Sequence, residues 1–445
     1  MALKQKKINS YVDKTFGVQP VWTLAQFIVI PHRNAFITSE AYWYNLVVRF
    51  TIIAMYVFTF VASLHYDSTI LSKNKSIVLK IGNNLNMYCG AMIMICSWLM
   101  TLKFPKLDDI FNQMSAIDRE IVQLFGNNEK IRKSERILFQ FEFTCVASAT
   151  VAYVVIGVYD IWMYPPCGLY IIFVDYFPVS YPYVVASLIV LQFVSLVKMV
   201  HLRIRIINEC LSHILDSCEV SNEAMPYPEE SIAHGSALNL RNRRIAFIMN
   251  QDGNTKNTRK SLSVENLTEK SLRILFELHD RLMDASEATN QCYSTNGIVF
   301  VTVSFIYAMF GIFFETKELF YNFKDADNLW MMAASYILWA TQYNAIIFVL
   351  LYVCELTRDA AYDTSMIVHK ILQKKPSFLL HSDIYYNKMK SFSLHVLHRK
   401  KTFNFSGQGL FVFDYTFIFS AISAGTSYLI VLLQFDMSFG RDKNV

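Results

Sequence analysis

The stretch from Phe177 to Val200 reads FPVSYPYVVASLIVLQFVSLVKMV, and it decides the fold class of this chain. It contains a single charged residue, Lys198, which lies near its end. About 20 predominantly apolar residues are enough for a helix to cross the hydrocarbon core of a bilayer. The stretch therefore predicts a membrane-spanning helix.

The chain as a whole shares this apolar character. Hydrophobic residues make up 53% of the 445 residues and charged residues only 17%, whereas charged residues average roughly 25% in soluble domains. Seven blocks are long and apolar enough to span a membrane, so we predict an all-α, seven-transmembrane protein. These blocks are about Asn45–Leu64, Asn86–Leu102, Phe141–Trp162, Phe177–Val200, Gly297–Phe314, Trp330–Tyr352 and Phe411–Phe435.

The positions of Lys and Arg predict the orientation of these spans. Of the 41 basic residues, 32 lie in the segments on one side of the membrane and 7 on the other, and two lie inside spans. Because basic segments stay in the cytoplasm, we place the N-terminus inside and the C-terminus outside. The predicted parts are a cytoplasmic N-terminus (1–44), spans 1–4 (45–200), a cytoplasmic helical extension and flexible loop (201–296), spans 5–6 (297–352), cytoplasmic anchor helices (353–410), span 7 (411–435) and an extracellular C-terminus (436–445).

Several functional classes do not fit this sequence. G-protein-coupled receptors have the opposite orientation, so we expect no G-protein partner, and the net charge of +5 does not indicate nucleic-acid binding. P-loop, HExxH and GxSxG motifs are absent from the sequence, so we expect no enzyme and no cofactor. His395 and His398 are spaced as a metal site could be, although we favour a solvated pair. Cys89 and Cys167 are the pair for which we expect a disulfide.

The cytoplasmic segments contain helical patterns of their own. Residues 201–218 extend the fourth span with a mixed polar and apolar face, and apolar residues recur at helical spacing from 272 to 282. Residues 355–375 and 383–398 alternate apolar and polar positions at three and four. Because exposed apolar stripes are unfavourable, we expect these helices to pack together below the membrane as one anchor domain.

The end of the last span carries the most specific motif. Ser427 and Tyr428 are followed by five apolar residues and then by Gln434 and Phe435. This pattern resembles the signature of insect gustatory receptors, Thr-Tyr, five mostly hydrophobic residues and Gln-Phe, with Ser427 in place of the threonine. The seven spans and the cytoplasmic N-terminus, obtained independently, agree with the resemblance.

The resemblance implies a ligand-gated, non-selective channel for cations (Na, K, Ca) in the lipid of the plasma membrane. It implies a homotetramer or heterotetramer opened by a small-molecule tastant, a sugar or a bitter compound. An odorant receptor of the same superfamily is the alternative of the same class, and a membrane transporter is the alternative of a different class.

The last helix of each subunit is then expected to line a central pore. One helix face carries Ser427, Ile430 or Val431, and Gln434. A pore lined by this face could close by dewetting at the apolar turn. The alternative interpretation is that this face packs against another helix. The predicted pore residues are Ser427, Ile430, Val431, Gln434, Phe435 and Asp436.

A ligand pocket is expected among the outer halves of the other spans, where aromatic and polar residues gather. The predicted ligand-binding residues are Tyr153, Tyr159, Tyr183, Tyr307, Tyr336, Trp339 and Gln342. Asn74 lies in a glycosylation sequon on the predicted outer side, whereas the sequons at Asn266 and Asn404 lie on the predicted inner side.

Overall fold

The computed structural model describes residues 39–69, 77–100, 104–125, 128–163, 177–223, 264–321, 326–374 and 383–441. These residues form nine helices and one short hairpin. The helices are α3 (Ser39–Thr69), α4 (Ile77–Met100), α5 (Phe104–Phe125), α6 (Asn128–Met163), α8 (Phe177–Glu223), α10 (Val264–Tyr321), α11 (Ala326–Lys374), α13 (Asp383–Thr402) and α14 (Tyr415–Arg441), with strands β1 (Ser406–Gly407) and β2 (Phe411–Val412) before α14. The described residues are therefore all-α apart from the hairpin, as predicted.

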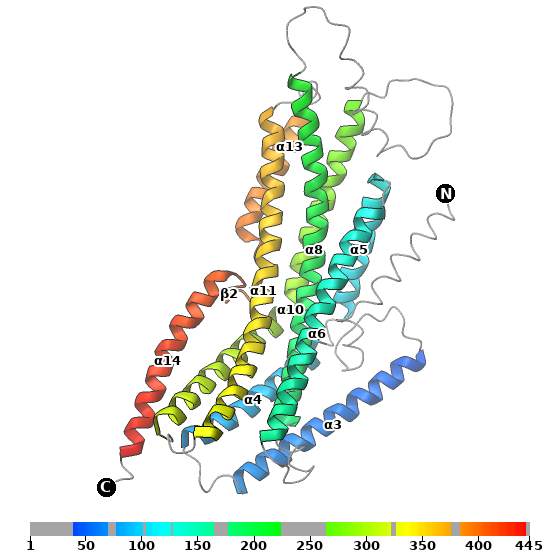
Figure 1. Ribbon diagram of the computed structural model, residues 1–445. Helices are drawn as coiled ribbons and strands as arrows, with labels where there is room; N and C mark the ends of the chain where they lie inside the picture. Colours follow the sequence, from blue (N-terminus) through cyan, green and yellow to red (C-terminus); the bar gives the residue numbers. More distant parts are fainter. Residues whose placement is uncertain are drawn as a thin grey trace, which may run out of the picture.

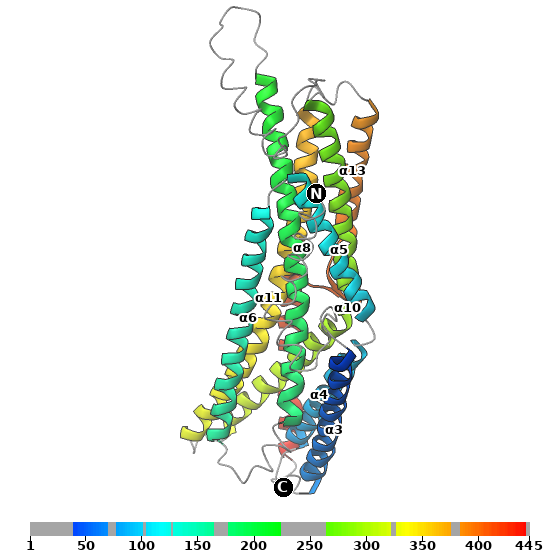
Figure 2. The ribbon, with the colours of Figure 1, turned by 90° about the vertical axis from the view of Figure 1, so that its right-hand side faces the viewer.

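Three long helices form the spine of the molecule. Helices α8, α10 and α11 contain 47, 58 and 49 residues, and each joins a predicted span to a predicted cytoplasmic helix without a break. Their upper parts pack with α5 and α13, and their lower parts with α4 and α6 (Figures 1 and 2). Residues 201–218 and 272–282, where the sequence predicts helical patterns, lie within two of these continuous helices.

Helix α8 lies at the centre of the core. From Tyr183 to Leu202 its apolar side chains are buried or nearly so, and it packs against α3, α4, α6, α10 and α11. Hydrogen bonds cross these interfaces: the Ser195 hydroxyl, for example, donates to the buried carboxylate of Glu142 on α6. Burial on every side explains why its sequence is apolar without a polar face.

Helix α5 is an amphipathic helix that the span pattern alone does not predict. Its buried apolar residues recur at three and four positions and face α10. Among them lies Asp118, whose two carboxylate oxygens accept hydrogen bonds from Arg203 of α8 at 3.0 and 2.9 Å. Both side chains are at most 1% exposed. This bidentate ion pair joins two of the helices that form the upper bundle.

The predicted spans fall on described helices, except at two ends: residues 101–102 of the second span lie outside the described residues, and the start of the last span is shifted. Five described helical stretches are long and apolar enough to cross a membrane, and two others, Phe50–His65 and Asn84–Met100, are shorter. The last helix begins at Tyr415 instead of Phe411, because Phe411 and Val412 form strand β2. Asp414 then caps the helix by accepting hydrogen bonds from the backbone N–H groups of Thr416 and Phe417.

Candidate functional site

Helix α14 stands at one edge of the molecule (Figure 1). One face, centred on Gly425, packs against α10, where a Cβ added at Gly425 would lie 3.1 Å from the sulfur of Met309. The other faces are open within the subunit: Phe419 is 74% exposed, Ile422 62% and Phe435 56%. An apolar helix with so little cover needs lipid or another chain around it.

The open side of α14 carries a stripe of polar side chains. Exposed residues spaced by three and four positions place hydroxyl and amide groups on one helix face, interrupted by a single apolar turn. The stripe consists of Thr416, Ser420, Ser423, Ser427, Ile430 with Val431, and Gln434. The Ser420 and Ser427 hydroxyls donate to carbonyls four residues earlier, which lowers the cost of placing hydroxyls in an apolar helix.

The predicted pore residues thus share an exposed region, and the sequence analysis missed part of the stripe. Ser427, Ile430, Val431, Gln434 and Phe435 are all exposed in the subunit. The side chain of Asp436 lies outside the described part of the structure. Thr416, Ser420 and Ser423 were missed, although stepping back from Ser427 by three and four residues would have found them.

A hairpin joins the upper bundle to the start of α14. Strands β1 and β2 pair antiparallel, and the Leu410 N–H donates to the Gly407 carbonyl at 2.9 Å. The two residues of the turn, Gln408 and Gly409, have φ angles of 51° and 74°. Positive φ at both positions is typical of the type I′ turn, which matches the twist of a hairpin.

The hairpin is seated on α10 through two glycines. A Cβ added at Gly407 would lie 2.5 Å from Ile298 Cγ1, and one added at Gly297 would lie 2.8 Å from the ring of Phe413. Each glycine therefore admits a bulky side chain from the opposite element. The Gln408 side-chain amide adds a hydrogen bond to Ser294 of α10 at 3.0 Å.

The same region is tied to α8 and α11. Phe405 and Phe413 are both buried, and each lies within 6.2 Å, centroid to centroid, of the Phe193 ring of α8. Arg358 of α11 pairs with Glu355 and lies 3.7 Å from the Asp414 carboxylate that caps α14. Helix α14 is therefore fixed to the core at its beginning and is open along most of its length.

A second group of predicted residues forms an aromatic cluster in the half of the bundle remote from α13. Tyr153, Tyr183, Tyr307 and Trp339 come from α6, α8, α10 and α11, and their rings contact one another. Tyr343, one turn after Trp339, completes the cluster and contacts three of these rings. It was missed, although its spacing of four from Trp339 places both on one helix face.

Hydrogen bonds hold two of these rings in place. The Tyr153 hydroxyl lies 2.6 Å from the Ser187 hydroxyl, and the Tyr183 hydroxyl donates to the Asn86 side-chain oxygen of α4. Gln342 is 9% exposed and lies on the same segment of α11. The side chains of Tyr159 and Tyr336 and the whole of Asn74 and Cys167 lie outside the described residues, and Cys89 is a buried free cysteine.

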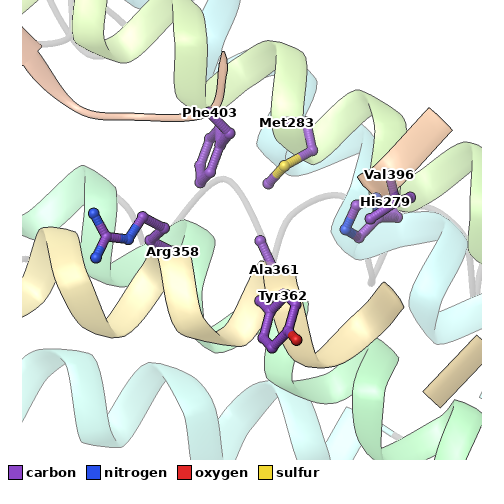
Figure 3. Close-up of a pocket in the computed structure, with 7 residues that line it drawn as sticks. All are labelled: His279, Met283, Arg358, Ala361, Tyr362, Val396 and Phe403. Atoms are coloured by element: carbon purple, nitrogen blue, oxygen red, sulfur yellow. The ribbon is translucent and has the colours of Figure 1, made fainter. Parts of the chain in front are cut away.

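A small cavity lies elsewhere, in the upper bundle (Figure 3). Its walls come from α10, α11, α13 and the chain before the hairpin, and it has room for about one water molecule. Its lining residues are His279, Met283, Arg358, Ala361, Tyr362, Val396 and Phe403. His279 is 1% exposed, and neither ring nitrogen makes a hydrogen bond to the described residues. This cavity is separate from the aromatic cluster.

The metal interpretation of His395 and His398 gains no support. Among the described residues no group of three or more His, Cys, Asp or Glu side chains is arranged to hold a metal ion. His395 is 56% exposed in its side chain and lies 3.8 Å from Asp280.

This chain is similar in sequence to chemosensory receptors and similar in fold to a solved insect olfactory receptor. The 7tm chemosensory receptor family profile matches residues 16–439. Gustatory and pheromone receptor 33a of Drosophila melanogaster is 43% identical over 173 residues, which is 39% of this chain and 36% of that receptor. The structure of the insect olfactory receptor OR5 from Machilis hrabei aligns with 97% of this chain and 99% of its own, with a TM-score of 0.56 and 12% identity.

Proposed function

Because this chain belongs to the 7tm chemosensory receptor family, we propose that it is one subunit of a ligand-gated, non-selective cation channel in the plasma membrane. Four copies, from this chain alone or together with related chains, place α14 around a central pore. The aligned part covers only about a third of the Drosophila relative. The relative named as a gustatory and pheromone receptor supports a small tastant as the ligand.

The open polar stripe of α14 carries this proposal. The Ser420 and Ser427 hydroxyls bond to backbone carbonyls, but the Gln434 amide and the remaining lone pairs of the hydroxyls would face hydrocarbon unfavourably, because lipid offers no hydrogen-bond partners. Within one subunit the stripe from Thr416 to Gln434 is exposed. Around a fourfold axis the same stripe faces water, and the apolar flanks, including Phe419 and Ile422, face neighbouring subunits or lipid. The apolar turn at Ile430 and Val431 forms the constriction, with a ring of Gln434 beside it.

Seven spans with the N-terminus in the cytoplasm complete the proposal. The two shorter apolar stretches, in α3 and α4, then cross the membrane in addition to the five longer ones. The upper bundle with α13 is then cytoplasmic, and the aromatic cluster lies toward the outer side. Glycan attached at Asn74 after expression in insect cells, with none at Asn404, is the expected result. Glycan at Asn404, in the chain leading into the hairpin, would reverse this orientation.

The pore is tested by recording current from cells that express variants of α14. A cationic thiol reagent should block current in Ser427→Cys, whose side chain is exposed, and spare Ala421→Cys, which lies on the side facing α10. Gln434→Ala should raise ligand-free current or change ion selectivity, because a ring of small side chains closes the pore less well.

Trp339→Leu supplies the control for these pore variants. It should alter ligand sensitivity and leave basal current and selectivity unchanged, since Trp339 lies in the aromatic cluster. Equal reactivity at positions 421 and 427, together with unchanged basal current and selectivity in Gln434→Ala, would show that α14 does not line the pore.

A further inference from the structure

Arg358 of α11 lies between two carboxylates that belong to different helices. Its guanidinium donates a hydrogen bond to Glu355, one turn earlier on α11, and its Nη1 atom lies 3.7 Å from Oδ2 of Asp414 at the start of α14. The side chains of Arg358, Glu355 and Asp414 are 30%, 17% and 16% exposed. Because these groups are largely shielded from water, their charges interact more strongly than those of a fully exposed ion pair.

The two carboxylate oxygens of Asp414 have separate partners. Oδ1 accepts hydrogen bonds from the backbone N–H groups of Thr416 and Phe417, at 3.0 and 3.3 Å, and so caps α14. Oδ2 faces Arg358 instead. One carboxylate therefore connects the guanidinium of α11 to the backbone of the first turn of α14, and a displacement of Arg358 acts directly on that turn.

Glu355 retains an unused acceptor beside the same guanidinium. Its Oε1 atom bonds to Arg358, whereas Oε2 is buried and has no hydrogen-bond partner among the described residues. A second hydrogen bond from Arg358 would satisfy this buried acceptor. Arg358 also lines the small cavity of the upper bundle (Figure 3), so there is unfilled volume beside its side chain. A shift of the guanidinium toward Glu355 would therefore be favourable at Glu355 and would break the contact with Asp414.

Helix α11 connects this ion pair to the aromatic cluster. Trp339 and Tyr343 of the cluster lie on the same unbroken helix as Arg358. At a rise of about 1.5 Å per residue, Tyr343 and Arg358 are about 22 Å apart along the helix axis. Rigid helices are among the elements that carry coupling over such distances.

We propose that Arg358 couples α11 to the pore-lining helix, by holding Asp414 and releasing it when the guanidinium shifts toward Glu355. The inference rests on the proposed channel function and names a positioning residue for its gating. Arg358 acts through the first turn of α14. The rings of Phe348 and Tyr415, 6.3 Å apart, supply a neighbouring uncharged contact between the same two helices.

Ligand-free current in cells and the melting temperature of purified full-length protein provide the first test. Arg358→Gln and Asp414→Asn each remove one charge and keep a polar side chain. Each should raise ligand-free current about fivefold, the lower end of measured couplings between sites, because the first turn of α14 loses its restraint. The double variant should raise the current no further, since the two groups act through each other. Melting temperatures should stay close to that of wild type.

Arg281→Gln is the matched control. Arg281 pairs with Glu120 of α5 at 2.6 Å and is 32% exposed, so this variant also breaks an ion pair between two helices with similar access to water. It should leave ligand-free current unchanged. Arg358→Lys keeps the charge and loses the forked guanidinium, so its current should lie between those of wild type and Arg358→Gln.

Hydrogen exchange of purified full-length protein gives a readout that does not depend on current. Arg358→Gln should speed amide exchange at residues 415–420 of α14 about fivefold, and exchange at residues 285–292 of α10 should not change. Should Arg358→Gln fail to fold, Asp414→Asn and Arg358→Lys decide the question by the same two measurements.

Two outcomes would overturn this coupling role: effects of the single variants that multiply in the double variant, or exchange at residues 415–420 that is the same in wild type and Arg358→Gln. The channel proposal is judged separately, by thiol block of the α14 variants. If no variant passes current while exchange at residues 415–420 responds as expected, the channel proposal fails and the link between α11 and α14 stands.

Discussion

Helices α8 and α14 are both apolar and long enough to span a membrane, yet they have opposite surroundings. In the most apolar 18-residue stretch of each, 89% of the residues of α8 are buried in the subunit and 6% of those of α14. Helix α8 is covered on all sides by other helices, and α14 touches mainly α10. An apolar sequence therefore predicts membrane insertion, and it does not tell a core helix from one that is completed by other chains.

The largest expected effect comes from breaking the ion pair that anchors α8. Asp118→Ala should leave the buried Arg203 guanidinium without its counter-ion, at a cost of about 3–5 kcal/mol. Loss of monodisperse protein in detergent, or a strongly lowered melting temperature, is the expected measurement. The double variant Asp118→Leu with Arg203→Met should recover much of the stability, because no buried charge remains. A single variant as stable as wild type would contradict this assignment.

A smaller effect is expected at the glycine that seats the hairpin. Gly407→Ala adds a Cβ that would lie 2.5 Å from Ile298 Cγ1, and overpacking of this kind costs about 1–3 kcal/mol. Because the hairpin leads into α14, ligand-gated current should fall more than expression does. Adding Ile298→Ala should restore current.

Gly409→Asn is the matched control in the same turn. Its position has a φ of 74° and nothing lies within 4 Å of an added Cβ, and Asn tolerates positive φ better than most residues. If Gly409→Asn is as damaging as Gly407→Ala, backbone strain and not the contact with Ile298 explains the loss.

Two charged substitutions distinguish folding from assembly in the upper bundle. Ile371 of α11 is fully buried, whereas Leu397 of α13 is 38% exposed. Ile371→Asp should abolish folding of the subunit, because burying an unpaired carboxylate carries a large free-energy cost. Leu397→Asp should give folded subunits with weakened assembly, visible as a shift from tetramer to monomer in size-exclusion chromatography with light scattering. Folded, tetrameric Leu397→Asp protein would exclude this surface from the contact between subunits.

The smallest effect is expected at the cap of α14. Asp414→Ala removes the side chain that accepts hydrogen bonds from the N–H groups of Thr416 and Phe417, at a cost of about 1 kcal/mol. Asp414→Asn keeps a good capping residue and removes only the charge that faces Arg358, so its melting temperature should stay closer to that of wild type. Equal losses in the two variants would assign the effect to the ion pair instead of the cap.

The sequence by itself determined the helical class and the positions of the apolar and amphipathic helical stretches. Runs of about 20 apolar residues and apolar spacings of three and four are local properties, so they can be counted without a structure. The Ser427-to-Phe435 motif likewise indicated the family that the comparisons then established. Four of the predicted ligand-binding residues do lie together, and their rings contact one another.

The tertiary structure alone decided which partners these residues meet. Asp118 and Arg203 are separated by 85 positions, and the local sequence around neither residue indicates that they pair. Gly407 and Ile298 fit because one lacks a side chain where the other needs room, and Tyr343 joins the cluster because α8, α10 and α11 converge there. The exposure of α14 has the same origin. Burial depends on what packs against each face of a helix, and that is a property of residues remote in the chain.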